Sequence, residues 1–118
     1  MNNYAPSSLL GQARPSDTNA ATLYTASLKT EIGRIIIANT SGSAATFRLF
    51  HDQGGSTYTE SNALAFDVSI ATGAINDALQ SFQMGNGITL AVTDTLGIRS
   101  SVANALTFTI YGVVSDAR

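Results

Sequence analysis

The most reactive side chain in the sequence is its single histidine, His51, which is followed directly by Asp52. A histidine beside a carboxylate can act as a general base or, with further ligands, hold a metal ion. Either role needs partners from elsewhere, and the chain has no second histidine and no cysteine to supply them. We therefore expect His51 to make a structural hydrogen bond at the end of a strand.

Two other groups of residues have types that occur in reactive sites. Asp67 and Asp94 could form a pair of carboxylates, but such pairs hydrolyse glycosides only at defined separations, which the sequence does not show. Two Gly-rich stretches, Gly54-Gly55 and residues 85–87, lack the following helix start with Lys and Ser or Thr that a phosphate-binding loop needs. We predict turns and surface positions for all of them, and therefore no catalytic residues, no metal site, no cofactor and no enzyme activity.

Length and composition restrict the number of domains and the classes of binding partner. The chain has 118 residues and no cysteine, which predicts one domain whose stability comes from burial, hydrogen bonding or association instead of disulfides. The six basic and eight acidic residues are spread along the chain without clustering. Nucleic-acid binding is disfavoured, because phosphate neutralisation needs a concentrated basic face.

Only 12% of the residues are charged, about half the usual share for a soluble domain. The outward positions are filled by neutral polar residues instead, since the sequence contains 14 Thr, 13 Ser and 8 Asn. Such a surface favours close contact with another protein, because burying it removes few charges from water. It is equally typical of a plain β-protein surface.

No apolar run approaches the roughly 18 to 20 residues of a membrane span, so no membrane partner is expected. The N-terminal segment also lacks the basic start and apolar core of a signal peptide. We expect the protein to be made and used in the cytoplasm, or in something assembled there.

Alternating apolar and polar residues predict strands along most of the chain. Residues 1–8 are polar and aperiodic and predict an extended N-terminal arm, while residues 9–118 predict one domain. Residues 31–40 contain three consecutive isoleucines, which favour a strand covered on both faces. A turn at residues 39–43 predicts that this strand forms a hairpin with residues 44–52. The remaining strands are expected at residues 9–14, 21–27 and 63–70.

The second half of the chain predicts a helix and a meander. Residues 71–86 have Ile75, Leu79 and Phe82 at helical spacing, with a strand at residues 78–83 as the alternative. Residues 88–115 hold three alternating runs separated by turns, which indicate a β-meander that the rest of the chain covers. The aromatic side chains of four phenylalanines are predicted in the core: Phe47, Phe66, Phe82 and Phe108.

About eight short strands at roughly ten-residue spacing, with at most one short helix, predict an all-β fold. We expect an antiparallel β-sandwich or jelly roll. Exposed Tyr24, Tyr58 and Tyr111 could form a sugar-binding patch on it.

Several short motifs are similar to those of small virion accessory proteins of tailed bacteriophages. They are the segment DTNAATLYTA at residues 17–26, an I-x-x-x-N-T-S-G turn beginning at Ile35 and followed by Thr46-Phe47-Arg48, the triplet Asp94-Thr95-Leu96, and a last strand ending in Tyr111-Gly112. The resemblance covers residues 10–114. It implies a β-sandwich that attaches to a phage particle, and it transfers no binding residue.

The first functional hypothesis from this resemblance is a capsid cement or decoration protein in the virion, assembled in the host bacterial cytoplasm. It would bind the major capsid protein across subunit joints, as a homo-oligomer, with a trimer expected. Six apolar or aromatic residues are the predicted partner-binding positions, either in the arm or facing outward: Tyr4, Leu9, Leu10, Phe50, Tyr58 and Val113.

Two alternatives remain open. The protein could belong to the phage tail, baseplate or fibre and bind surface glycans, with Tyr58 and the loop at residues 54–62 as the contact region. A small glycan-processing enzyme on a jelly-roll scaffold would need carboxylates or a metal near His51.

Overall fold

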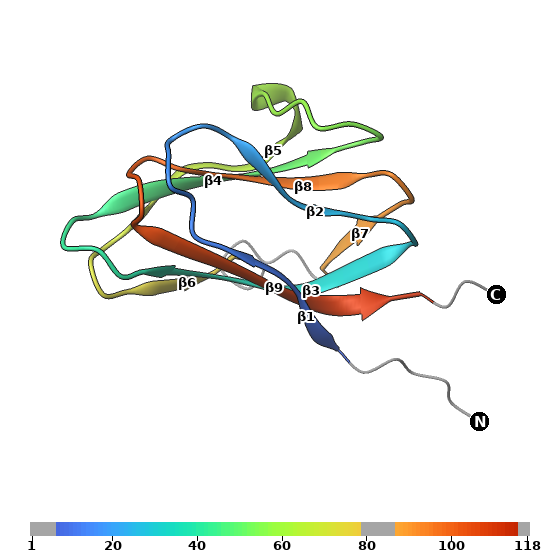
Figure 1. Cartoon of the computed structure of the whole chain (residues 1–118), viewed down its shortest axis with the longest axis horizontal. Helices are drawn as coiled ribbons and strands as arrows, with labels where there is room; N and C mark the ends of the chain where they lie inside the picture. The colour runs from blue at the N-terminus through green and yellow to red at the C-terminus, as the bar shows by residue number, and fades with distance from the viewer. Residues whose placement is uncertain (1–6, 79–86, 116–118) are drawn as a thin grey trace.

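The chain folds into a β-sandwich of two antiparallel sheets, which confirms the predicted fold class (Figure 1). The computed structural model describes residues 7–78 and 87–115. Sheet A holds, in order, β1 (Ser8–Ala13), β9 (Leu106–Val114), β3 (Thr30–Asn39) and β6 (Ile75–Asp77), and β7 (Ile88–Leu90) also pairs with β3. Sheet B holds β2 (Ala21–Thr25), β8 (Thr95–Ser100), β4 (Ala45–Asp52) and β5 (Ala63–Ile70). One 3₁₀ turn, η1 (Glu60–Asn62), precedes β5.

The core lies between the two sheets and is built from the inward-facing residues of their central strands. Phe47 on β4 and Phe108 on β9 meet edge to face, with ring centroids 6.4 Å apart, and both are fully buried. Ile35 and Ile37 point into the same core, whereas Ile36 between them is half-buried on the outer side of sheet A. The prediction that this strand is covered on both faces is therefore wrong for its outer face.

The predicted strand positions are largely confirmed, but two predicted pairings are wrong. β3 and β4 form no hairpin, because β3 lies in sheet A and β4 in sheet B, on opposite layers of the sandwich (Figure 1). The expected meander does not form either, because β7 and β9 belong to sheet A and β8 between them to sheet B. Of the described strands, β4 and β5 are the one pair that is adjacent both in the chain and in a sheet.

The motif residue Asn39 explains how the chain leaves β3 and crosses to sheet B. Its side chain is 1% exposed. The Nδ2 atom donates to the carbonyls of Ser43 and Ile70, at 2.9 and 3.0 Å, and Oδ1 accepts from the Ser41 amide and hydroxyl. An amide with both ends satisfied fixes this turn, so the asparagine of the motif has a structural role.

A β-bulge in β5 reverses part of the predicted alternation. Phe47 pairs with Val68 and Leu49 with Ala65, so β5 contains one more residue than β4 in this interval. Asp67 takes a positive φ of 54° at this point. An extra residue in one strand breaks the alternation, so the inward-facing parity differs before and after it. Phe66 consequently faces outward and is 38% exposed, which corrects its predicted place in the core.

The predicted helix at residues 71–86 is not found in its first part. The chain turns at Thr72-Gly73, where Gly73 has a φ of 72°, and continues as the short strand β6. The rest of that prediction, including Phe82, falls on residues 79–86, outside the described part of the chain. Within the described residues, no helix has the length and hydrophobicity that crossing a membrane requires.

Candidate functional site

The histidine predicted to be structural is joined to a carboxylate from far along the chain. His51 Nε2 lies 2.9 Å from Asp94 Oδ2, and Asp94 is 5% exposed in the turn before β8. Asp94 also accepts hydrogen bonds from the backbone amides of Gly54 and Ala91. The carboxylate thus ties the turn after β4 to the turn before β8.

The same contacts make stability depend on pH in the acid range. The hydrogen bond from His51, followed by those from the backbone amides, holds the pKa of Asp94 below its ordinary value of 3.8, against the opposing effect of burial. A carboxylate with a depressed folded-state pKa stabilises the fold above the unfolded pKa. This contribution is lost as the pH falls through the folded-state pKa.

We therefore expect the Asp94→Asn variant to show a flatter decline of the free energy of unfolding below about pH 4 than the wild-type protein. Urea unfolding measured at intervals between about pH 2 and pH 5 checks this expectation. A residual slope is expected from Asp67, whose pKa is lowered by its hydrogen bond from Arg48. Identical slopes for the two proteins would show that Asp94 does not contribute.

The outer side of sheet B is partly covered by the loop between β4 and β5. Tyr58 from this loop packs on Phe50, with ring centroids 5.4 Å apart. The Tyr58 hydroxyl donates to Thr95 Oγ1 at 2.9 Å and lies 2.6 Å from Thr22 Oγ1. Phe50 is only 2% exposed as a result. The expectation that Phe50 faces a partner is wrong, because Tyr58 occupies that side of it.

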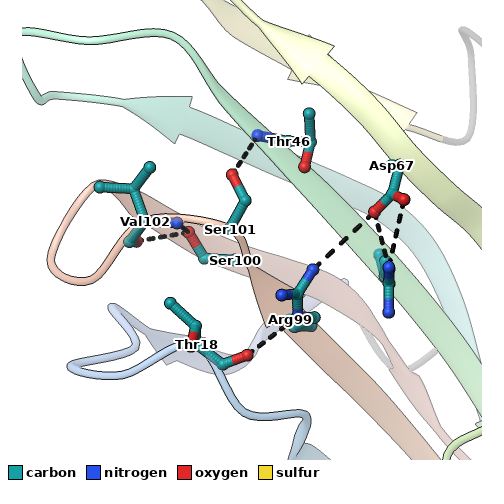
Figure 2. A network of polar contacts seen from close by, with 8 residues as sticks. Thr18, Thr46, Asp67, Arg99, Ser100, Ser101 and Val102 are labelled. Carbon is teal, nitrogen blue, oxygen red and sulfur yellow. Dashed lines mark hydrogen bonds and ion pairs between the residues drawn. The ribbon is translucent and has the colours of Figure 1, made fainter.

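Beside Tyr58, two arginines share one carboxylate. Arg48 on β4 and Arg99 on β8 are register partners. Arg48 binds Asp67 through Nε and Nη2, at 2.7 and 3.1 Å, and Arg99 Nη1 lies 3.8 Å from the same carboxylate. Figure 2 shows Arg99 between Asp67 and the Thr18 carbonyl, to which its Nε donates at 2.9 Å. The Arg48 guanidinium also lies 3.8 Å from the Phe66 ring centroid.

These residues line an open hollow of about 560 Å³ on the outer side of sheet B. We call it the arginine hollow. Its walls come from five parts of the chain: the segment before β2, strand β4, the loop after β4, strand β5 and strand β8. The lining residues are Thr18, Asn19, Ala20, Arg48, Phe50, Tyr58, Thr59, Glu60, Phe66 and Arg99.

The outer side of sheet A, which we call the sheet-A face, has a different character. Residue pairs across antiparallel strands lie on the same side of a sheet, and register therefore places Leu9 beside Tyr111, and Ala38 beside Ile75. Leu9 is 52% exposed and Ile75 67% exposed. Arg34 forms an ion pair with Asp77 at 3.2 Å. A shallow hollow of about 580 Å³ lies here, lined by Ser7, Gly33, Arg34, Ile36 and Tyr111.

The predicted partner-binding residues do not form one site. Leu9 and Leu10 belong to strand β1, which confirms the strand predicted at residues 9–14, and Leu10 packs against the core instead of facing a partner. Val113 is half-buried on the sheet-A face, opposite Glu31. Tyr58 lies on the other side of the sandwich, at the arginine hollow. Tyr4 and most of the predicted arm lie outside the described residues.

No family model, curated protein or solved structure matches the chain. The similarity to phage virion accessory proteins therefore rests on the sequence motifs alone and stays a prediction. Within residues 7–78 and 87–115, no three His, Cys, Asp or Glu side chains come together in a group that could hold a metal ion.

Sequence reasoning missed the arginine hollow, although part of its signal was present. Arg48 and Asp67 both occupy polar positions in strongly alternating segments. Pairing these two strands across the loop at residues 53–62 would have placed the opposite charges near one another. Arg99 carries no such signal, because its place beside Arg48 depends on β8 joining sheet B.

Proposed function

We propose that this protein is a non-enzymatic structural component of a tailed-phage particle, a capsid decoration protein that binds the major capsid protein. The observation that carries the proposal is the composition of the sheet-A face. Interfaces are depleted in charge at their centre and contain apolar and aromatic side chains. The sheet-A face combines apolar or aromatic residues with uncharged polar ones: Leu9, Gln12, Ile36, Ala38, Ile75, Thr107, Thr109, Tyr111 and Val113.

Two charges on this face are paired with each other, and Glu31, opposite Val113, accepts a hydrogen bond from Thr89 Oγ1 at 3.2 Å. Arg34 and Asp77 already neutralise one another at 3.2 Å. Burying an ion pair that keeps its partner costs less than burying an isolated charge. A protein partner could therefore cover the centre of the face with little electrostatic penalty.

A protein that binds only the assembled shell stabilises it by mass action. At a free concentration one hundred times the dissociation constant, the gain is about 2.7 kcal/mol per site. A homotrimer, as expected from the resemblance, would present three sheet-A faces on one particle and raise its residence time through multivalency. The protein would then be located in the virion.

The test uses the purified chain and empty phage heads assembled from the major capsid protein. We expect the chain to sediment with the heads and to raise the temperature at which they break open. Replacing Ile75 with lysine should weaken this binding at least tenfold, because about 1.4 kcal/mol is enough for that change. The variant should fold, since Ile75 is 67% exposed and surface substitutions usually cost within about 0.5 kcal/mol.

The matched control is Ser69→Lys, which adds the same charge to an exposed position on β5 of sheet B. It should bind heads like the wild-type protein. Equal binding by the Ile75 variant would exclude the sheet-A face as the docking surface. Sedimentation with tails alone would exclude the capsid role and favour the tail or baseplate alternative.

A further inference from the structure

The arginine hollow contains one arginine whose hydrogen-bonding capacity is largely unused. Arg48 donates two hydrogen bonds to Asp67 at 2.7 and 3.1 Å. Arg99 donates through Nε to the Thr18 carbonyl, and its nearest described carboxylate oxygen, on Asp67, is 3.8 Å away. A guanidinium has five N–H donors. Most of those on Arg99 are therefore available to an anion that enters the hollow.

The orientation of Arg99 is fixed before any ligand arrives. Its Nε is held by the Thr18 carbonyl, and Figure 2 shows the guanidinium lying between that carbonyl and Asp67. Its side chain is 25% exposed and lines the hollow. A cation fixed in this way loses less conformational freedom on binding than a free surface arginine does.

The shape of the Arg99 guanidinium favours a carboxylate as the ligand. Asp67, whose carboxylate lies 3.8 Å from Arg99, and Glu60, which lines the hollow, offset the charges of Arg48 and Arg99. The planar guanidinium matches a carboxylate, which it can bind through two parallel hydrogen bonds.

The rest of the hollow supplies the groups that a sugar ring uses. Phe66 is 38% exposed, with the Arg48 guanidinium over one face of its ring, and Tyr58 forms a second aromatic wall. Hydroxyl, amide and carboxylate side chains stand at the rim and can exchange hydrogen bonds with sugar hydroxyls: Thr18, Asn19, Thr59 and Glu60. The volume of about 560 Å³ falls within the range of small-ligand sites.

We propose that the arginine hollow binds a carboxylated sugar, with the carboxylate on Arg99 and the apolar side of the ring against Phe66. This binding site is independent of the capsid role, because it lies on the opposite side of the sandwich from the sheet-A face. A glycan-bearing cell surface or a polysaccharide with acidic units would supply such a ligand.

The experiment titrates the folded protein with glucuronic acid, glucose, acetate and inorganic phosphate at moderate ionic strength, with binding followed by calorimetry and by NMR chemical shifts. We expect glucuronic acid to bind at least tenfold more tightly than the other three. Arg99→Gln should reduce that affinity at least tenfold. Arg34→Gln, which removes an arginine from the sheet-A face instead, should leave it unchanged.

A second variant measures the contribution of the sugar ring to binding separately from that of its carboxylate. Phe66→Ala should weaken glucuronic acid binding several-fold while leaving the weak acetate response as it is. Equal affinities for glucuronic acid and acetate would overturn the sugar assignment, and tighter binding of phosphate would overturn the carboxylate assignment. Unchanged binding in a folded Arg99→Gln protein would exclude the arginine hollow as the site.

Discussion

Replacing Gly112 with alanine is expected to lower the free energy of unfolding by about 3 kcal/mol or more, the upper end of the cost of overpacking. Gly112 lies in β9 between Ser8 of β1 and Ile32 of β3. A Cβ at this position would collide with the Glu31 carbonyl oxygen and would lie 2.9 Å from Leu10 Cδ1. Because the Glu31 carbonyl oxygen belongs to the backbone, β3 and β9 must move apart to relieve this clash.

The control for this variant is Gly33→Ala in the same sheet. A Cβ at Gly33 meets no atom within 4 Å, so its stability should stay within about 0.5 kcal/mol of the wild-type value. Urea unfolding followed by circular dichroism measures both proteins. Equal stability of the two variants would show that β1, β9 and β3 are not packed as closely as described.

Replacing Tyr58 with alanine is expected to lower the free energy of unfolding by about 2–4 kcal/mol, a little below the cost of removing a fully buried aromatic ring. The change uncovers Phe50, against which the Tyr58 ring packs at 5.4 Å. It also removes the hydroxyl that joins the loop to Thr95 and Thr22. Thermal and urea unfolding, with fluorescence of an apolar dye to detect the exposed Phe50, measure these effects.

The Tyr58→Phe variant separates the two contributions. It keeps the ring on Phe50 and loses only the hydroxyl, so a cost of about 1 kcal/mol is expected. Losses of the same size in both variants would show that the hydrogen bonds, and not the covering of Phe50, hold the loop in place.

The strands of this protein could be predicted from sequence because alternation depends on local burial. The polar neighbours of Phe47 and Phe108 predict that both rings lie in the core, and both are fully buried. The pairing of strands could not be predicted in the same way. A short turn such as residues 40–44 can join two strands of one sheet, or can span the roughly 10 Å between two packed sheets. The alternation within β3 and β4 is the same in both cases.

The contacts at the candidate sites depend on how the strands pair, so local sequence patterns do not predict them. His51 and Asp94 are 43 residues apart in sequence, and no local pattern links them. An unbroken alternation predicts Phe66 in the core, whereas the bulge at Asp67 changes which side chains of β5 face inward. Aspartate is one of the residues that tolerate a positive φ, but its presence in a strand does not by itself predict a bulge.

The position of β9 at the centre of sheet A has a consequence for how the protein is made. β9 pairs with both β1 and β3, yet it is the last strand of the described chain. On the ribosome, β1 and β3 emerge early and stay without their shared neighbour until synthesis has passed Val114. Folds dominated by such distant pairings form in about milliseconds to seconds, slower than helical domains. Sheet A therefore closes only once β9 has been synthesised, and the isoleucine-rich strand β3 lacks this neighbour until then.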